Sequence, residues 1–251
     1  MIIYKSPPEV DRMRKAGRIV AGTIDRVVAS VRPGITTADL DRVAESYIHE
    51  RDATPSFKGY RGFPASICTS LNNEVVHGIP SPKRVLREGD LLSLDFGAIW
   101  DGFHADAAVT VFVGGAPSSE AEKLVRVTEE SLYAGIARIR PGGRLSDVSN
   151  AVEQVAAGAG FAVVREYVGH GIGRKLHEDP QIPNYGPPGR GPEMRPGLVV
   201  AVEPMVNMGD WPTRVLADDW TVVTEDGSLS AHFEHTIAVT EDGHEVLTAR
   251  D

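Results

Sequence analysis

Two apolar runs flank the turn residues Trp100-Asp101-Gly102, and this stretch decides the fold: Leu91-Leu-Ser-Leu-Asp-Phe96 precedes the turn and Ala107-Ala-Val-Thr-Val-Phe-Val113 follows it. Short apolar runs bounded by turn residues predict strands, so the stretch predicts an antiparallel hairpin. Asp95 and Asp106 are equidistant from a turn centred between Trp100 and Asp101. A regular hairpin with that centre places the two carboxylates directly opposite one another, where like charges destabilise a sheet.

A cation between Asp95 and Asp106 would convert this repulsion into coordination. The alternative is a bulged register in which both acids face solvent. Two further acids favour the metal, because Glu203 ends the apolar run 198–203 and Glu234 lies in the strand-like segment 229–239. Four inward-facing carboxylates without counterions would be very costly to bury, whereas two divalent cations balance their charge. Hard oxygen ligands favour Mn, Fe, Co or Zn together with water.

The chain repeats one plan at a fixed offset. Arg32-Pro-Gly34 and Arg140-Pro-Gly142 are 108 residues apart. The same offset relates Asp39-Leu40 to Asp147-Val148, Arg87-Glu-Gly89 to Arg195-Pro-Gly197, and Asp95 to Glu203. This repetition predicts an α/β (α+β) fold of two duplicated helix-plus-antiparallel-strand halves, about 8–117 and 118–251, with a pseudo-twofold axis and a site between them. The Pro/Gly-rich stretch 183–197 is expected to be a surface loop, so residues 1–251 are expected to form a single domain.

Each half is expected to begin with helices. Ser6-Pro7-Pro8-Glu9 has the form of a helix start, and apolar positions continue at helical spacing to Val31, before Arg32-Pro-Gly34 stops the run. A second helix is expected from Thr37. In the other half, helical spacing starts at Ser118 or Ser119 and ends at Arg140-Pro-Gly142.

Composition narrows the class of protein. The 251 residues carry a formal net charge of −9, which disfavours a nucleic-acid backbone or an anionic membrane as partner. The amino-terminal residues do not resemble a signal peptide, and no apolar run approaches the roughly 18 residues of a membrane helix. The single cysteine, Cys68, cannot form an internal disulfide and suits a reducing compartment. We therefore expect a cytoplasmic protein.

A glycine-rich segment supplies histidines. His170 and His177 are seven residues apart in Tyr167–Glu178, which is neither an HExxH nor a zinc-finger spacing. A nucleotide-binding loop is disfavoured because the glycines lack the GxGxxG spacing and no apolar helix follows. His170 is the expected nitrogen ligand because its glycine neighbours let a ligand approach the backbone. A structural histidine is the alternative.

These motifs together resemble the bacterial type I methionine aminopeptidases, which have the pita-bread fold. The resemblance covers nearly the whole chain. It rests on Asn73-Glu-Val-Val-His77-Gly-Ile-Pro80, Leu94-Asp-Phe-Gly97, Gly102-Phe-His-Ala-Asp106, Gly169-His-Gly-Ile-Gly-Arg174, His177-Glu178, Glu203-Pro-Met205 and Phe233-Glu-His-Thr236. All five metal positions of the family carry the expected residue types in the expected order.

The resemblance implies a role for each of these residues. Asp95 chelates one metal ion, Asp106 and Glu234 bridge both ions, and His170 and Glu203 complete the site of the other. A water held between the ions attacks the first peptide carbonyl, with Glu203 as the proton acceptor. His77 and His177 contact the scissile peptide, and His177 stabilises charge on the carbonyl oxygen.

The resemblance also implies an apolar slot for a methionine side chain. Its expected lining is Phe57, Tyr60, Phe63, Cys68, Leu176 and Trp220; ordinary core is the alternative for Phe63 and Cys68. Phe57 and Leu176 depart from the family pattern, which has a smaller residue at the first position and an aromatic one at the second. Cys68 is not expected to be a nucleophile because no base accompanies it.

The activity implied is removal of the initiator methionine from nascent polypeptides whose second residue is small, by a monomer with two divalent metal ions. A transient ribosome contact is left open. Three alternatives remain. A proline-directed aminopeptidase or dipeptidase of the same fold usually carries an additional amino-terminal domain. A non-catalytic pita-bread binding protein should have lost metal ligands. A dimetal phosphoesterase should have clustered basic residues near its metal motifs.

Overall fold

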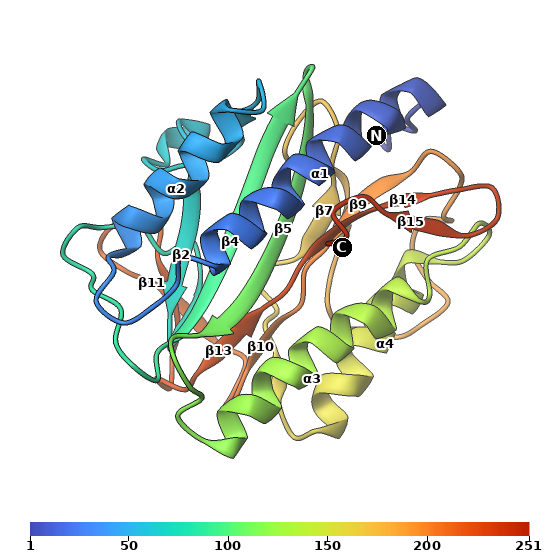
Figure 1. The fold of residues 1–251 in the computed structure, drawn as a ribbon. Coiled ribbons are helices and arrows are strands. Elements are labelled where there is room, and N and C mark those ends of the chain that lie inside the picture. Colours follow the sequence, from blue (N-terminus) through green and yellow to red (C-terminus); the bar gives the residue numbers. More distant parts are fainter. Residues whose placement is uncertain (251) are drawn as a thin grey trace.

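The computed structural model describes residues 1–250. Four helices lie on the near side of the strands in Figure 1: α1 (Pro7–Val28), α2 (Thr37–His49), α3 (Ser119–Ile136) and α4 (Leu145–Gly158). A short 3-10 helix, η1, covers Tyr60–Gly62. The strands are β1 (Thr54–Pro55), β2 (Ile67–Leu71), β3 (Glu74–Val76), β4 (Leu91–Trp100), β5 (Phe103–Phe112), β6 (Ala162–Val163), β7 (Gly169–Gly171), β8 (Glu178–Ile182), β9 (Val199–Val202), β10 (Met205–Asn207), β11 (Thr213–Val215), β12 (Val222–Thr224), β13 (Ser230–His232), β14 (His235–Val239) and β15 (His244–Val246).

The predicted helix starts are confirmed by their caps. Ser6 and Glu9 form a capping box at α1, and Thr36 forms one with Asp39 at α2. These boxes satisfy backbone N–H groups that have no partner within the first helical turn. The first helix ends at Val28, earlier than the periodicity through Val31 predicted, because the chain turns at Ala29–Ser30 before the Arg32-Pro33 segment.

The duplicated plan reappears in the elements themselves. α1 and α3 end 108 residues apart, and the same offset separates the starts of α2 and α4 and the starts of β4 and β9. Each helix pair packs an apolar face onto strands. One continuous core includes Ile24 and Leu40 from the first pair together with Leu132 and Val148 from the second. The mixed helix-and-strand architecture is therefore as the sequence predicted.

The hairpin has a different register from the one predicted. Trp100 pairs with Phe103, so Asp101 and Gly102 form a two-residue turn. Both have positive φ, 46° and 76°, as the hairpin turns that match strand twist require. Asp95 consequently faces Ala108, and Asp106 faces Gly97. The prediction of directly opposed acids was wrong by two positions, because the turn is centred on Asp101-Gly102 and not on Trp100-Asp101.

The strand expected over residues 229–239 is also two strands. β13 pairs with β10 in a three-stranded sheet, whereas β14 pairs with β9 and β15 in a five-stranded sheet. Phe233 and Glu234 lie between them, where the chain leaves one sheet and enters the other. Glu234 is therefore held at a sheet junction, with Ala108 as its bridge partner.

A seam of hydrogen bonds joins β5 to the segment from β13 to β14, which lie side by side in Figure 1. The Thr236 hydroxyl donates to Asp106 O (2.8 Å) and accepts from Asp106 N–H (2.9 Å). The Thr110 hydroxyl makes the same pair of contacts to the backbone of His232, at 2.8 and 2.9 Å. The seam therefore fixes the backbone of Asp106, His232 and Glu234 against one another.

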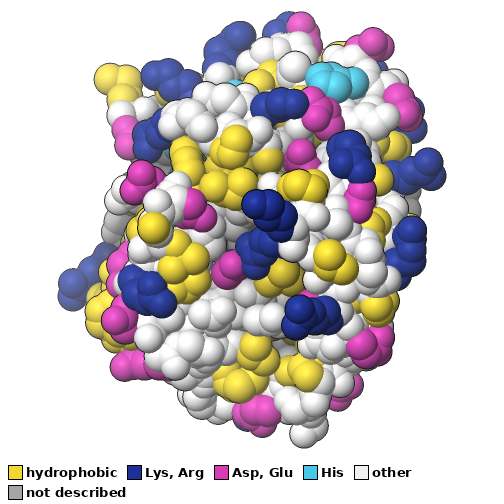
Figure 2. Space-filling view, turned by 90° about the vertical axis from the view of Figure 1, so that its left-hand side faces the viewer, with side chains coloured by type: hydrophobic (Ala, Val, Ile, Leu, Met, Phe, Trp, Pro, Cys, Tyr) yellow, Lys and Arg dark blue, Asp and Glu magenta, His cyan; other side chains and the backbone are white. Residues whose placement is uncertain are grey.

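The surface carries charges of both signs. In Figure 2 basic, acidic and hydrophobic side chains alternate over the face shown, and none of the three types covers it. Among residues 1–250, no helix combines the length and the apolar character needed to cross a membrane.

Candidate functional site

All thirteen residues predicted for the site line one cavity of about 370 Å³. They are Phe57, Tyr60, Phe63, Cys68, His77, Asp95, Asp106, His170, Leu176, His177, Glu203, Trp220 and Glu234. Within the described residues 1–250, the lining comes from strands, loops and η1, and none of it comes from α1–α4. The helices therefore support the site from behind the strands without contributing side chains to it.

Strand geometry brings the four acids together. Asp95 on β4 and Asp106 on β5 are diagonal neighbours on one face of the hairpin, within reach of a shared ligand. The β9–β14 register, continued one residue beyond His235 and Val202, sets Glu203 opposite Glu234. The bridge between Ala108 and Glu234 then places Glu203 and Glu234 beside the β4–β5 hairpin, which bears Asp95 and Asp106.

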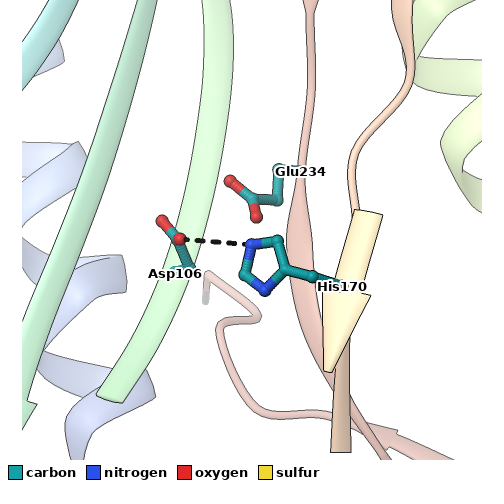
Figure 3. Close-up of side chains that lie close together, drawn as sticks. All are labelled: Asp106, His170 and Glu234. Atoms are coloured by element: carbon teal, nitrogen blue, oxygen red, sulfur yellow. Dashed lines mark ion pairs between the residues drawn. The ribbon is translucent and has the colours of Figure 1, made fainter. Parts of the chain in front are cut away.

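Three side chains converge from three strand regions. Asp106, His170 and Glu234 point toward one another in Figure 3, and each offers a ligand atom within 4.8 Å of the other two. His170 Nε2 lies 4.0 Å from Asp106 Oδ2 and 3.4 Å from Glu203 Oε1. The distance to Asp106 is longer than a direct hydrogen bond. The three side chains surround a common point in the cavity.

The acids repel one another in the absence of a cation. Burial raises the pKa of Asp95 to about 7. Burial and the neighbouring carboxylates, Asp95 among them, raise the pKa values of Asp106, Glu203 and Glu234 well above the usual range. Oδ1 of Asp95 and Oδ1 of Asp106 are buried without a hydrogen-bond partner among the described residues. Buried polar atoms normally have partners, so this donor set fits divalent cations.

His170 is oriented by its own strand. Its Nδ1 lies 2.9 Å from the carbonyl oxygen of Gly171, so Nδ1 carries the proton and Nε2 keeps a lone pair directed at the acids. Burial lowers the pKa of His170 to about 3, which keeps the ring neutral. A metal-binding histidine characteristically donates its other N–H to a backbone carbonyl in this way.

His77 and His177 both line the cavity. His77 has a left-handed backbone (φ 62°), a strained conformation for a residue with a side chain that is common at functional sites. The imidazole of His177 lies 4.2 Å from that of His170, measured between ring centroids. The Tyr60 hydroxyl and His177 Nδ1 share a hydrogen bond of 2.8 Å, which holds the exposed ring of His177 at the cavity.

The apolar side chains form a cluster beside the acids. Phe57, Phe63, Cys68 and Leu176 are buried in one cluster, with Tyr60 and Trp220 packed against it. Trp220 meets Phe63 edge-on, with ring centroids 5.1 Å apart. Burial and the nearby Asp95 raise the pKa of the Cys68 thiol well above its usual range, so the thiol remains protonated. The cluster therefore offers an uncharged slot next to a charged centre.

Sequence reasoning missed several lining residues. His232 is the most informative of them, because it is 2% exposed and its Nε2 lies 4.0 Å from Glu203 Oε2. The others are Arg61, Val76, Glu166, Tyr167, Val168, Gln181 and Met205. A signal for His232 was present, since residues i and i+2 of a strand share a face and His232 precedes Glu234 by two. The remainder carry no chemical pattern that distinguishes them from ordinary surface or core.

The fold and this site define a class of protein that sequence comparison identifies. The profile of metallopeptidase family M24 matches residues 11–241, and the chain belongs to that family. The family is one of metal-dependent peptidases, which agrees with the acid and histidine cluster.

Individual relatives narrow the class. The chain is 53% identical to the methionine aminopeptidase of Clostridium acetobutylicum and 55% identical to methionine aminopeptidase 1 of Bacillus subtilis, over 99% of each chain in both cases. The crystal structure of a methionine aminopeptidase from Thermotoga maritima superposes with a TM-score of 0.98 at 48% identity, covering 100% of both chains. Within family M24 the chain therefore belongs with the methionine aminopeptidases, and its fold is the pita-bread fold.

Proposed function

We propose that the protein uses this cavity to remove the amino-terminal methionine of polypeptides whose second residue is small, by hydrolysis of the first peptide bond. The observation that carries the proposal is the convergence of four carboxylates, two buried and two half-buried, and one oriented imidazole beside an apolar slot. The full-length likeness to methionine aminopeptidases supports the choice of substrate.

Two divalent ions, drawn from Mn, Fe, Co and Zn, fit the donor set. Asp95, Asp106, His170, Glu203 and Glu234 would hold them, with Asp106 and Glu234 shared between both ions. The partnerless oxygens of Asp95 and Asp106 support this assignment. When bound, such ions supply a Lewis acid and a water whose pKa is lowered toward neutrality.

The chain's own residues orient the peptide and move the proton. His170 remains neutral and keeps its lone pair on the metal side because Nδ1–H is engaged by Gly171. Glu203 accepts the proton of the attacking water and passes it to the leaving amine. His77 and His177 hold the scissile peptide, and the contact with Tyr60 fixes the ring of His177.

The apolar slot holds the methionine side chain. Phe57, Phe63, Cys68 and Leu176 offer no charge to a thioether, and Trp220 and Tyr60 close its edges. The family pattern has a smaller residue at the position of Phe57 and an aromatic one at that of Leu176, so the slot should have its own shape. Gly97 accommodates the ring of Phe57, because a Cβ at Gly97 would lie 2.8 Å from Phe57 Cε1.

In the cell, we propose a single catalytic domain over residues 1–251 that acts as a monomer in the cytoplasm. Its substrates are the amino termini of nascent polypeptides. The lone cysteine, which suits a reducing compartment, supports the location. The net charge of −9 is consistent with the absence of a nucleic-acid partner.

Peptide hydrolysis tests the proposal. The purified protein should hydrolyse Met-Ala-Ser and leave Met-Leu-Ser and Ala-Pro-Ala intact. Activity should disappear with a chelator and return with Mn or Co. Turnover of Ala-Pro-Ala without turnover of Met-Ala-Ser would replace the proposal with the proline-directed alternative. No hydrolysis of any of these peptides with both ions bound would favour the binding-protein alternative.

A further inference from the structure

His232 is a fourth imidazole in the cavity, besides those of His77, His170 and His177, and it has no role in the function proposed above. It ends β13, its side chain is 3% exposed, and it lines the cavity. Its Nε2 is buried without a hydrogen-bond partner among the described residues. A buried polar atom left without a partner costs stability, so its presence in a cavity points to a functional use.

The backbone at His232 is held rigidly enough to aim the ring. The Thr110 hydroxyl accepts the N–H of His232 at 2.9 Å and donates to its carbonyl oxygen at 2.8 Å. These two bonds join His232 to β5, the strand that carries Asp106. The imidazole therefore occupies a defined position relative to the acids.

Glu203 lies between two imidazoles. Its Oε1 is 3.4 Å from Nε2 of His170, and its Oε2 is 4.0 Å from Nε2 of His232. Nε2 of His170 carries a lone pair and no proton, because Nδ1 of that ring donates to the carbonyl oxygen of Gly171. Around a shared cation, Oε1 and this lone pair can both act as ligands. Oε2 faces Nε2 of His232, a ring nitrogen without a hydrogen-bond partner among the described residues.

We propose that His232 is a positioning residue for Glu203: its ring carries the proton on Nε2 and donates it to Oε2, leaving Oε1 for the metal side. The inference rests on the role proposed for Glu203 as ligand and proton acceptor. A small rotation of either side chain closes the 4.0 Å gap. The two carboxylate oxygens of Glu203 then differ in role: Oε1 faces the metal side, and Oε2 accepts the hydrogen bond from His232.

If the role of His232 were purely structural, His232→Leu would lower the thermal stability of the protein. The proposed role predicts the opposite result for stability. Replacing a buried, unpartnered imidazole by leucine removes an unsatisfied polar atom, so His232→Leu should be as stable as the wild type or more stable. The same change frees Oε2 of Glu203. Loss of such an outer contact typically reduces activity or metal affinity by about 10–100-fold.

The experiment compares His232→Leu with His232→Gln, which keeps an N–H donor. For Met-Ala-Ser, His232→Leu should lower kcat by about 10–100-fold with little change in KM, and should weaken zinc binding measured by calorimetry. His232→Gln should recover most of both losses. Thr69→Val is the matched control: the Thr69 hydroxyl is also buried without a partner, and strand alternation directs it away from the cavity that Cys68 lines. It should leave kcat unchanged.

Nitrogen NMR of histidine-labelled, zinc-loaded protein gives a second readout that does not depend on activity. The signal of His232, assigned from the variants, should show a proton on Nε2 and none on Nδ1. A proton on Nδ1, or wild-type kcat and zinc affinity in His232→Leu, would overturn the inference. So would equal losses in both variants that follow a loss of thermal stability. Wild-type failure to hydrolyse Met-Ala-Ser would instead refute the proposed function.

Discussion

The β4–β5 hairpin carries Asp95 and Asp106 within one continuous ladder, whereas Glu203 and Glu234 lie just beyond the paired ends of β9 and β14. The first two acids are eleven residues apart and a two-residue turn joins their strands. The second two are thirty-one residues apart, and the chain between them forms β10–β13.

The difference shows that the two halves place their acids by different means. In the hairpin, local pairing alone fixes the spacing of the two carboxylates, and they are diagonal. In the second half, the strand register places Glu203 opposite Glu234. The hydrogen-bond seam with β5 and the bridge of Glu234 to Ala108 hold them there. The first pair therefore depends on a turn, and the second depends on contact with the first half.

Asp106 lies where both halves meet, so its removal should have the largest effect. Asp106→Ala should reduce hydrolysis of Met-Ala-Ser by about 10²–10³-fold, the scale of losing a central electrostatic group. Loss of a ligand shared by both ions also predicts fewer than two zinc ions per chain, measured by elemental analysis. Near-normal turnover with two ions bound would show that the hairpin does not supply a shared ligand.

The cost of gathering four acids should appear in the pH dependence of the metal-free protein. The folded-state pKa of Asp95 is about 7 and that of Asp106 is also raised, so between about pH 4 and 7 the folded protein binds more protons than the unfolded chain. The free energy of unfolding contributed by these groups is therefore greatest at low pH and is lost as pH rises through their folded pKa values.

Asp106→Asn removes one of these titrations and serves as the comparison. Urea unfolding in chelator should show Asp106→Asn more stable than the wild type, by an amount that grows from pH 5 to pH 8. Added zinc should reverse the order at pH 8, because metal binds the ionised acids. A stability difference that is independent of pH would contradict the repulsion argument.

The smallest expected effect concerns the turn that only the first half uses. Gly102 has a φ of 76°, so Gly102→Ala should destabilise the protein by about 1 kcal/mol. Gly158 ends α4 in open space and is the control, since Gly158→Ala should be stabilising by up to about 1 kcal/mol. Urea unfolding measures both, and equal shifts would show that the turn geometry does not constrain the hairpin.

The sequence determined those features that local chemistry encodes. Capping boxes at Ser6 and Thr36 fixed two helix starts, and the repeat at 108 residues reappeared in helices and strands alike. The residue types of the site were also readable, because buried acids in apolar strands conflict with burial unless a cation accompanies them. The Asp101-Gly102 turn was readable too, yet centring it one residue early misaligned the acids by two positions.

Only the tertiary structure decided how distant segments meet. The chain changes sheets at Phe233-Glu234, because β13 pairs with β10 whereas β14 pairs with β9, and no local pattern distinguishes this from one long strand. The hydrogen-bond seam between β5 and β14 joins residues far apart in the chain. His232 and Glu203 are likewise distant in sequence but adjacent in the cavity. Periodicity reports which face a residue occupies, but the partner across that face is set by packing.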